Sequence, residues 1–91
     1  MKKMHVEYEL ADETTGTVRI LAADKIAFEA FARSHGQPVE DGPKALTYML
    51  FAALQRTGVV PTAADFSDFV TSTLLDLAPS QTAGDEENPT R

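Results

Sequence analysis

The fold is decided by one stretch, PKALTYMLFAALQRTG, which runs from Pro43 to Gly58. Seven consecutive apolar side chains lie in its middle. At about 100° per residue they point in nearly every direction from a helix axis, and such a helix is normally buried on more than one side. Pro43 suits the first helical position, and Gly58 suits the left-handed position after the last turn. The pattern predicts a central core helix over residues 43–57, with Leu50 and Leu54 among the most buried residues.

The N-terminal part of the chain has the pattern of two strands. Apolar and polar residues alternate over residues 5–10, and the alternation resumes over residues 17–21. The link over residues 11–16 is polar and contains a Thr-Thr-Gly run typical of turns. A β-hairpin with one buried face and one polar face is therefore predicted.

The next segment predicts a helix over residues 23–35. Asp24 is favourable in the first turn of this helix and Arg33 in its last turn, because their charges complement the helix dipole. The main apolar stripe, widened by Phe28, is expected to consist of Ile26, Ala27, Ala30 and Phe31. In the central helix, Arg56 lies in the last turn, where a cation interacts favourably with the helix dipole.

A third helix is predicted over residues 63–78. Thr62 and Asp65 have the spacing of a capping box, and apolar residues then recur at helical intervals up to Pro79. Residues 80–91 contain no large apolar side chain and concentrate acidic charge. We therefore expect one α+β domain over residues 1–78, in which a β-hairpin is followed by three helices around the central hydrophobic helix. Residues 79–91 are expected to form a disordered acidic tail.

The composition limits the kind of protein. The 91-residue chain has no cysteine, so it has neither a disulfide framework nor a thiolate metal site. Its formal net charge of −6 repels nucleic-acid backbones, and we expect no nucleic acid as a partner. No apolar signal segment follows Lys2 and Lys3, and no apolar run approaches the about 20 residues of a membrane-spanning helix. A cytoplasmic protein that does not bind membranes is expected.

No catalytic constellation is evident in the sequence. It contains no phosphate-binding glycine loop, no paired metal-ligand histidines and no nucleophile elbow. His5, Glu7 and Glu9 share a strand face and have the chemistry of metal ligands, but an exposed polar strand face explains the same residues. We expect a protein that is not an enzyme, with no catalytic residue, no cofactor and no metal.

Aromatic residues are many for so small a core. The chain has two tyrosines and five phenylalanines, and a hairpin with three short helices can hardly enclose all of them. Those left outside would form an exposed apolar patch, which marks partner binding. The candidates lie at stripe margins or on an already filled face: Phe28, Phe51, Phe66 and Phe69. The open edges of the hairpin also suggest binding, because an unpaired edge invites strand addition.

With these elements placed, the chain resembles the tail assembly chaperones of long-tailed bacteriophages. The resemblance lies in the strand at 18–21 with the helix at 24–36, the alanine-rich helix at 46–58, and the acidic-aromatic segment 65–69. It implies a non-enzymatic protein in the host cytoplasm that binds the aggregation-prone tape measure protein while tail tube subunits assemble around it. The partner is then the tape measure protein or another helical protein client, and homo-oligomerisation is compatible with this function.

Three other functions compete with this interpretation. The negative charge suggests an acidic inhibitor or nucleic-acid mimic, but three of the acidic residues lie in the predicted tail. A helix-turn-helix regulator would use residues 63–77 as its recognition helix, which carries three aspartates and no lysine or arginine. A small oligomerisation module is the least specific alternative.

Overall fold

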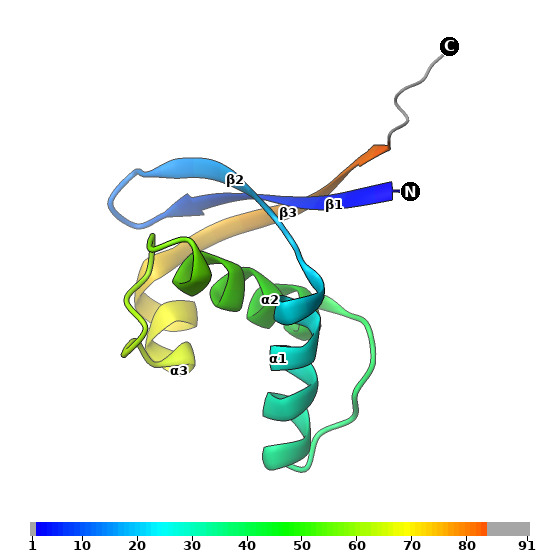
Figure 1. Ribbon diagram of the computed structural model, residues 1–91. Helices are drawn as coiled ribbons and strands as arrows, with labels where there is room; N and C mark the ends of the chain where they lie inside the picture. The colour runs from blue at the N-terminus through cyan, green and yellow to red at the C-terminus, as the bar shows by residue number, and fades with distance from the viewer. Residues whose placement is uncertain (1, 84–91) are drawn as a thin grey trace.

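The computed structural model describes residues 2–83, which form an α+β domain (Figure 1). The hairpin consists of β1 (Lys2–Leu10) and β2 (Thr15–Arg19), and two helices follow, α1 (Ala22–Ser34) and α2 (Pro43–Arg56). The one-turn helix α3 (Phe66–Asp68) continues into a π-helical turn, η1 (Phe69–Thr73), and the last element is strand β3 (Leu74–Ala83). The predicted α+β class, the hairpin and the two long helices are confirmed.

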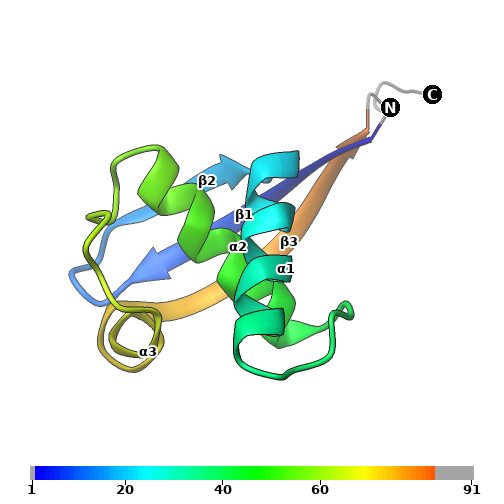
Figure 2. The same cartoon turned by 60° about the horizontal axis from the view of Figure 1, so that its bottom comes forward.

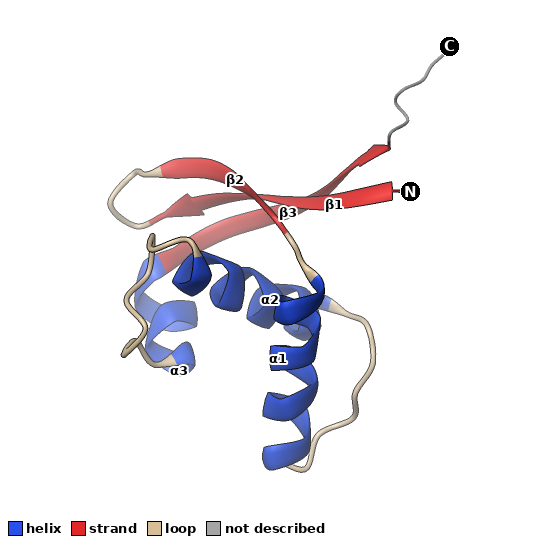
Figure 3. Cartoon of the chain, viewed as in Figure 1, coloured by secondary structure: helices blue, strands red, loops and turns tan. Residues whose placement is uncertain are grey.

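The sheet and the helices form two layers. The sheet is antiparallel with strand order β2-β1-β3, so β1 is the central strand. All the helices lie on one face of it (Figures 2 and 3). Val6 and Val18 are directly opposite one another and buried, whereas Glu7 and Thr17 form the next pair and are exposed. The predicted alternation of the hairpin is therefore correct.

The predicted third helix is wrong for half of its length. Helical structure begins only at Phe66, where the N-cap Asp65 accepts a hydrogen bond from the Asp68 N–H through Oδ2 at 3.2 Å. It ends at Thr73, and residues 74–83 form β3 along the second edge of β1. The backbone of β1 would otherwise leave that edge unpaired, and this long-range pairing prevails over the local helical pattern.

The predicted tail also begins too early. Residues 79–83 belong to β3, so the expected boundary after Ala78 falls inside a strand. Residues 84–91, which make up the rest of the predicted tail, lie outside the described residues. The prediction considered only side-chain burial, but the backbone of residues 79–83 pairs with β1 and does not need apolar side chains to do so.

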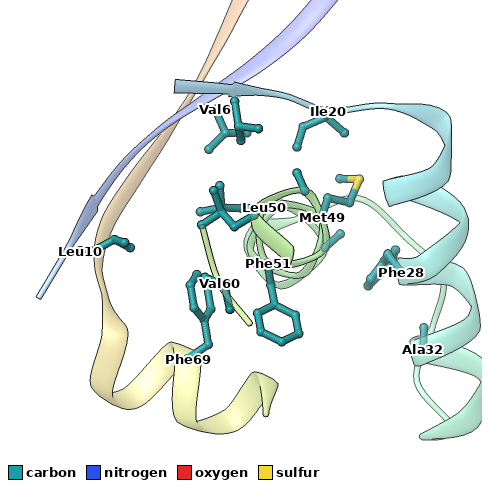
Figure 4. Packing of buried hydrophobic residues seen from close by; sticks show 14 residues of the cluster. Val6, Leu10, Ile20, Phe28, Ala32, Met49, Leu50, Phe51, Val60 and Phe69 are labelled. Atoms are coloured by element: carbon teal, nitrogen blue, oxygen red, sulfur yellow. The ribbon is translucent and has the colours of Figure 1, made fainter. Parts of the chain in front are cut away.

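The core surrounds α2, as predicted. Leu50 and Leu54 have no exposed surface. In a view along α2, Val6 comes from the sheet, Phe28 from α1 and Phe69 from η1 (Figure 4). The central helix is thus covered by a different element on each of three sides, which explains why it tolerates apolar residues around its circumference.

Helix α1 is rotated relative to the prediction. Its buried residues are Asp24, Phe28 and Ala32. Ile26, expected in the main stripe, is 64% exposed, and Ala30 is exposed as well. The helix is apolar on two sides, and the larger aromatic ring takes the inner one because it buries more surface against α2.

A buried ion pair, which the sequence analysis missed, joins the first turn of α1 to the last turn of α2. Asp24 is almost fully buried; its Oδ2 accepts hydrogen bonds from the Leu21 N–H at 2.8 Å and from Arg56 Nη2 at 3.0 Å. Arg56 Nε donates to Oδ1 at 3.3 Å, and Nη2 also donates to the Arg19 carbonyl of β2 at 2.9 Å. Arg56 therefore fixes the relative positions of β2, α1 and α2.

Candidate protein-binding surface

Three of the four predicted partner-binding residues lie in the core. Phe28, Phe51 and Phe69 are 8%, 3% and 2% exposed, so the expectation that they form an exposed patch is wrong. The helical turn that precedes β3 provides the additional cover: the Phe51 ring centroid lies 5.1 Å from that of Phe69 and 5.4 Å from that of Phe66. Phe66 is the exception, because it remains half-buried.

Three half-buried rings lie together where the sequence analysis expected a patch. Phe31 and Tyr48 are stacked with centroids 4.3 Å apart, and Phe66 lies 5.3 Å from Phe31 and 4.8 Å from Tyr48. They come from α1, α2 and α3, respectively. We call these three residues the aromatic surface. Tyr48 and Phe66 contact the Phe51 ring, and all three residues keep part of their surface in contact with solvent.

The segment between α2 and α3 positions Phe66. Val60 is buried, and Gln55 Nε2 donates hydrogen bonds to the carbonyls of Pro61 at 3.2 Å and Thr62 at 3.3 Å. These contacts tie the loop to the last turns of α2, and the Asp65 cap then starts the helix that carries Phe66. A short segment without much regular structure is thereby held in one place.

The aromatic surface is uncharged. Burial raises the pKa of the Tyr48 hydroxyl above its ordinary value, so the phenol stays neutral at physiological pH. At its α1 end, His35 lies 4.3 Å from Phe31 between ring centroids. Val70, which follows Phe66 by four residues, adds an apolar side chain that is 42% exposed.

Helix α1 extends this surface with an apolar stripe. Ala27 precedes Phe31 by four residues and Ile26 precedes Ala30 by four, so the pairs are neighbours on the helix surface. We define the α1 stripe as Ala23, Ile26, Ala27 and Ala30. By helical geometry, Lys25 and Glu29 project away from Ala27, whereas Arg33 follows Ile26 by seven residues and lies on the Ile26 side of the helix, at the border of the stripe. We call the residues of the α1 stripe and of the aromatic surface together the uncharged area; none of them carries a charge, and Arg33 lies at its border.

The free edge of β3 is poorly suited to strand addition. The Met4 carbonyl of β1 accepts a hydrogen bond from the Ile20 N–H at 2.9 Å, so the backbone groups of Met4 and of every second residue after it point towards β2. The backbone groups of the intervening β1 residues pair with β3, and this register leaves the backbone groups of Leu77 and Pro79 pointing to the free edge of β3. Pro79 has no N–H, and the Leu77 N–H already donates to Asp76 Oδ1 at 2.8 Å. Two successive donors are thus missing from this edge, which argues against strand addition to β3. Of the two hairpin edges considered in the sequence analysis, that of β1 is paired with β3, and β2 is an edge strand of the sheet.

Comparisons with protein-family models, curated proteins and solved structures found no match to this chain. Over residues 2–83, no helix has both the length and the apolar character required to span a membrane. Within the same range, no group of three or more His, Cys, Asp or Glu side chains is arranged to hold a metal ion.

Proposed function

We propose that this protein is a non-enzymatic tail assembly chaperone that binds the tape measure protein, or a similar helical client, in the host cytoplasm. The observation that supports the proposal is the uncharged area formed by the aromatic surface and the α1 stripe. Ile26 of the α1 stripe is exposed and the three rings of the aromatic surface are half-buried, and apolar surface of this kind marks a site that another molecule covers.

The chemistry of the area fits an apolar helix as client. A long helical protein that has not yet been packed into its assembly exposes an apolar stripe with the same i, i+3, i+4 spacing. Such a stripe aggregates unless an apolar surface covers it, and a helix laid on an apolar surface is a common mode of recognition. Aromatic side chains such as Phe31, Tyr48 and Phe66 offer a large contact area with few rotatable bonds.

The charge of the chain supports the same function in a different way. Acidic residues are absent from the uncharged area but present on the outer sheet face, where Glu7 and Glu9 are exposed. A net charge of −6 keeps a complex with an apolar client from self-associating, without contributing to the contact itself.

Co-expression tests the proposal. The protein is produced in a bacterial host with the long helical protein encoded next to it, and the soluble fraction of that client is measured. Wild type is expected to raise the soluble fraction, and Ile26→Asn to abolish most of the gain, because truncating an anchor weakens binding by about 2 kcal/mol, or roughly 30-fold. Val59→Asn is the matched control, since Val59 is also an exposed aliphatic residue but lies in the loop after α2.

Two outcomes would count against the proposal. If the client is equally soluble with no chaperone, or if Ile26→Asn and Val59→Asn behave alike, the uncharged area does not hold a client. If the protein by itself sediments as a dimer and Ile26→Asn makes it a monomer, a second copy covers the area and the oligomerisation module is the better description.

A further inference from the structure

A second apolar feature lies on the other side of α1. A cavity of about 500 Å³ opens between α1, the loop that leads to α2, the N-terminal half of α2, and the strands β1 and β3. Its apolar lining consists of Val39 in the loop and of five residues from the helices and strands, Met4, Phe28, Leu46, Met49 and Pro79. We call it the apolar pocket. None of these five residues belongs to the aromatic surface or to the α1 stripe.

The rim of the apolar pocket is acidic. Glu29 of α1 and Glu40 and Asp41 of the loop lie around it, and Lys25 is the one cation among the lining residues. All four side chains are exposed, and three carboxylates against one ammonium give the rim a net charge of −2. Among the described residues, none forms an ion pair with these carboxylates. Their exposure allows a cation of a partner to approach them.

The distribution of polar groups indicates a protein segment rather than a small molecule. Small-molecule sites place a few polar groups inside the pocket, where they fix the orientation of the ligand. Here the interior is apolar and the charged groups are at the exposed rim, which is the arrangement of a protein–protein contact with an apolar centre and a polar border. Met4 and Met49 are unbranched and adjust readily to the shape of an incoming side chain.

We propose that the apolar pocket binds a segment of a partner protein in which one bulky apolar side chain is flanked by lysines or arginines. The apolar side chain enters between Phe28, Leu46 and Met49, and the flanking cations pair with Glu29, Glu40 and Asp41. This site goes beyond the proposed chaperone function and does not depend on it, because no residue is shared with the uncharged area.

Peptide binding tests this proposal. The probe is a capped pentapeptide with a central phenylalanine between two pairs of lysines, titrated into the protein while the methionine methyl resonances are followed by NMR. The chain has three methionines, and those of Met4 and Met49 should shift while the isoleucine methyl of Ile26 does not. Replacing the central phenylalanine of the probe by serine should weaken binding by about tenfold or more.

Charge reversal provides the control. The double variant Glu40→Lys, Asp41→Lys should weaken binding at least about tenfold in 50 mM salt, and about 0.5 M salt should reduce the difference. The double variant Glu7→Lys, Glu9→Lys changes the net charge equally but on the outer sheet face, and it should have a much smaller effect. All four residues are exposed, so both variants are expected to fold.

Three results would overturn the proposal. One is the absence of any Met4 or Met49 shift at millimolar probe, and another is equal weakening by the two double variants, which would indicate unspecific attraction. The third is binding of the serine probe as tightly as the phenylalanine probe, because the apolar anchor would then play no part. Binding by the wild type and loss in Leu46→Trp, whose larger side chain fills the cavity, would support the assignment independently of charge.

Discussion

The two sides of α1 carry similar residues in different surroundings. On the inner side, Phe28 and Ala32 are buried against α2, and Asp24 is paired with Arg56. On the outer side, Ile26 and Ala30 are exposed although they are as apolar as the buried residues. Apolar character alone therefore does not separate residues that stabilise a fold from residues available to a partner. Only the packing of the neighbouring elements separates them.

The largest effect should come from the inner side. Phe28→Ala removes a buried ring that contacts the core around α2, and we expect the free energy of unfolding to fall by about 3–5 kcal/mol. Leu50→Ala in α2 should lower it by about 2–5 kcal/mol for the same reason. Urea unfolding followed by circular dichroism measures both. If Phe28→Ala loses less than about 1 kcal/mol, α1 does not use this side for packing.

The ion pair on the same side should come next. Arg56→Ala leaves the Asp24 carboxylate buried without its counter-ion, and we expect the free energy of unfolding to fall by about 3 kcal/mol. This value is at the low end for a broken buried pair, because the Arg56 side chain is one-third exposed. The double variant Asp24→Asn, Arg56→Ala removes the buried charge as well and should recover part of this loss in the same unfolding experiment. A double variant less stable than Arg56→Ala would contradict the assigned pairing.

Phe66 is intermediate between the two sides, because it packs on Phe51 yet remains half-buried. Phe66→Ala should lower the free energy of unfolding by about 2 kcal/mol, roughly half the value for a fully buried ring. It should also weaken client binding, measured on the folded variant by pull-down at 10 °C below its melting midpoint. A variant with reduced stability and unchanged binding would remove Phe66 from the proposed contact.

The smallest effect on stability should come from the outer side. Ile26→Asn changes a side chain that is 64% exposed, and the free energy of unfolding should stay within about 0.5 kcal/mol of wild type. Thermal melts of Ile26→Asn and of the control Val59→Asn should therefore be nearly superimposable. A large destabilisation by Ile26→Asn alone would show that the outer side contributes to the fold.

Local patterns in the sequence predicted the elements whose partners are close in the chain. The hairpin strands alternate because they pair across a short turn, and α2 is recognisable from its unbroken apolar run between Pro43 and Gly58. In contrast, α1 has apolar residues on two sides, and the spacing of its apolar residues alone could not decide whether Ile26 or Phe28 faces the core. The choice depends on where α2 lies, which the segment itself does not encode.

The remaining differences come from contacts between distant residues. The segment that forms β3 has helical spacing, yet it pairs with β1, some seventy positions earlier: Leu77 opposes Tyr8. The partner of Arg56 is 32 residues away, so its last-turn position suggested only a dipole interaction. Of the four residues predicted to form an exposed aromatic patch, only Phe66 belongs to the aromatic surface, because the burial of Phe51 and Phe69 depends on the turn before β3.

The isoleucine methyl spectrum tests the central claim most directly. The chain has two isoleucines, Ile20 in the core and Ile26 on the outer side of α1, so each side of the comparison has its own resonance. With 13C-methyl isoleucine in the protein and an unlabelled apolar helical fragment of the proposed tape measure client added, the Ile26 signal should shift or broaden while the Ile20 signal stays in place. If the fragment is shown by an independent method to bind and the Ile26 signal of the protein does not change, the proposal that the α1 stripe holds the client is contradicted.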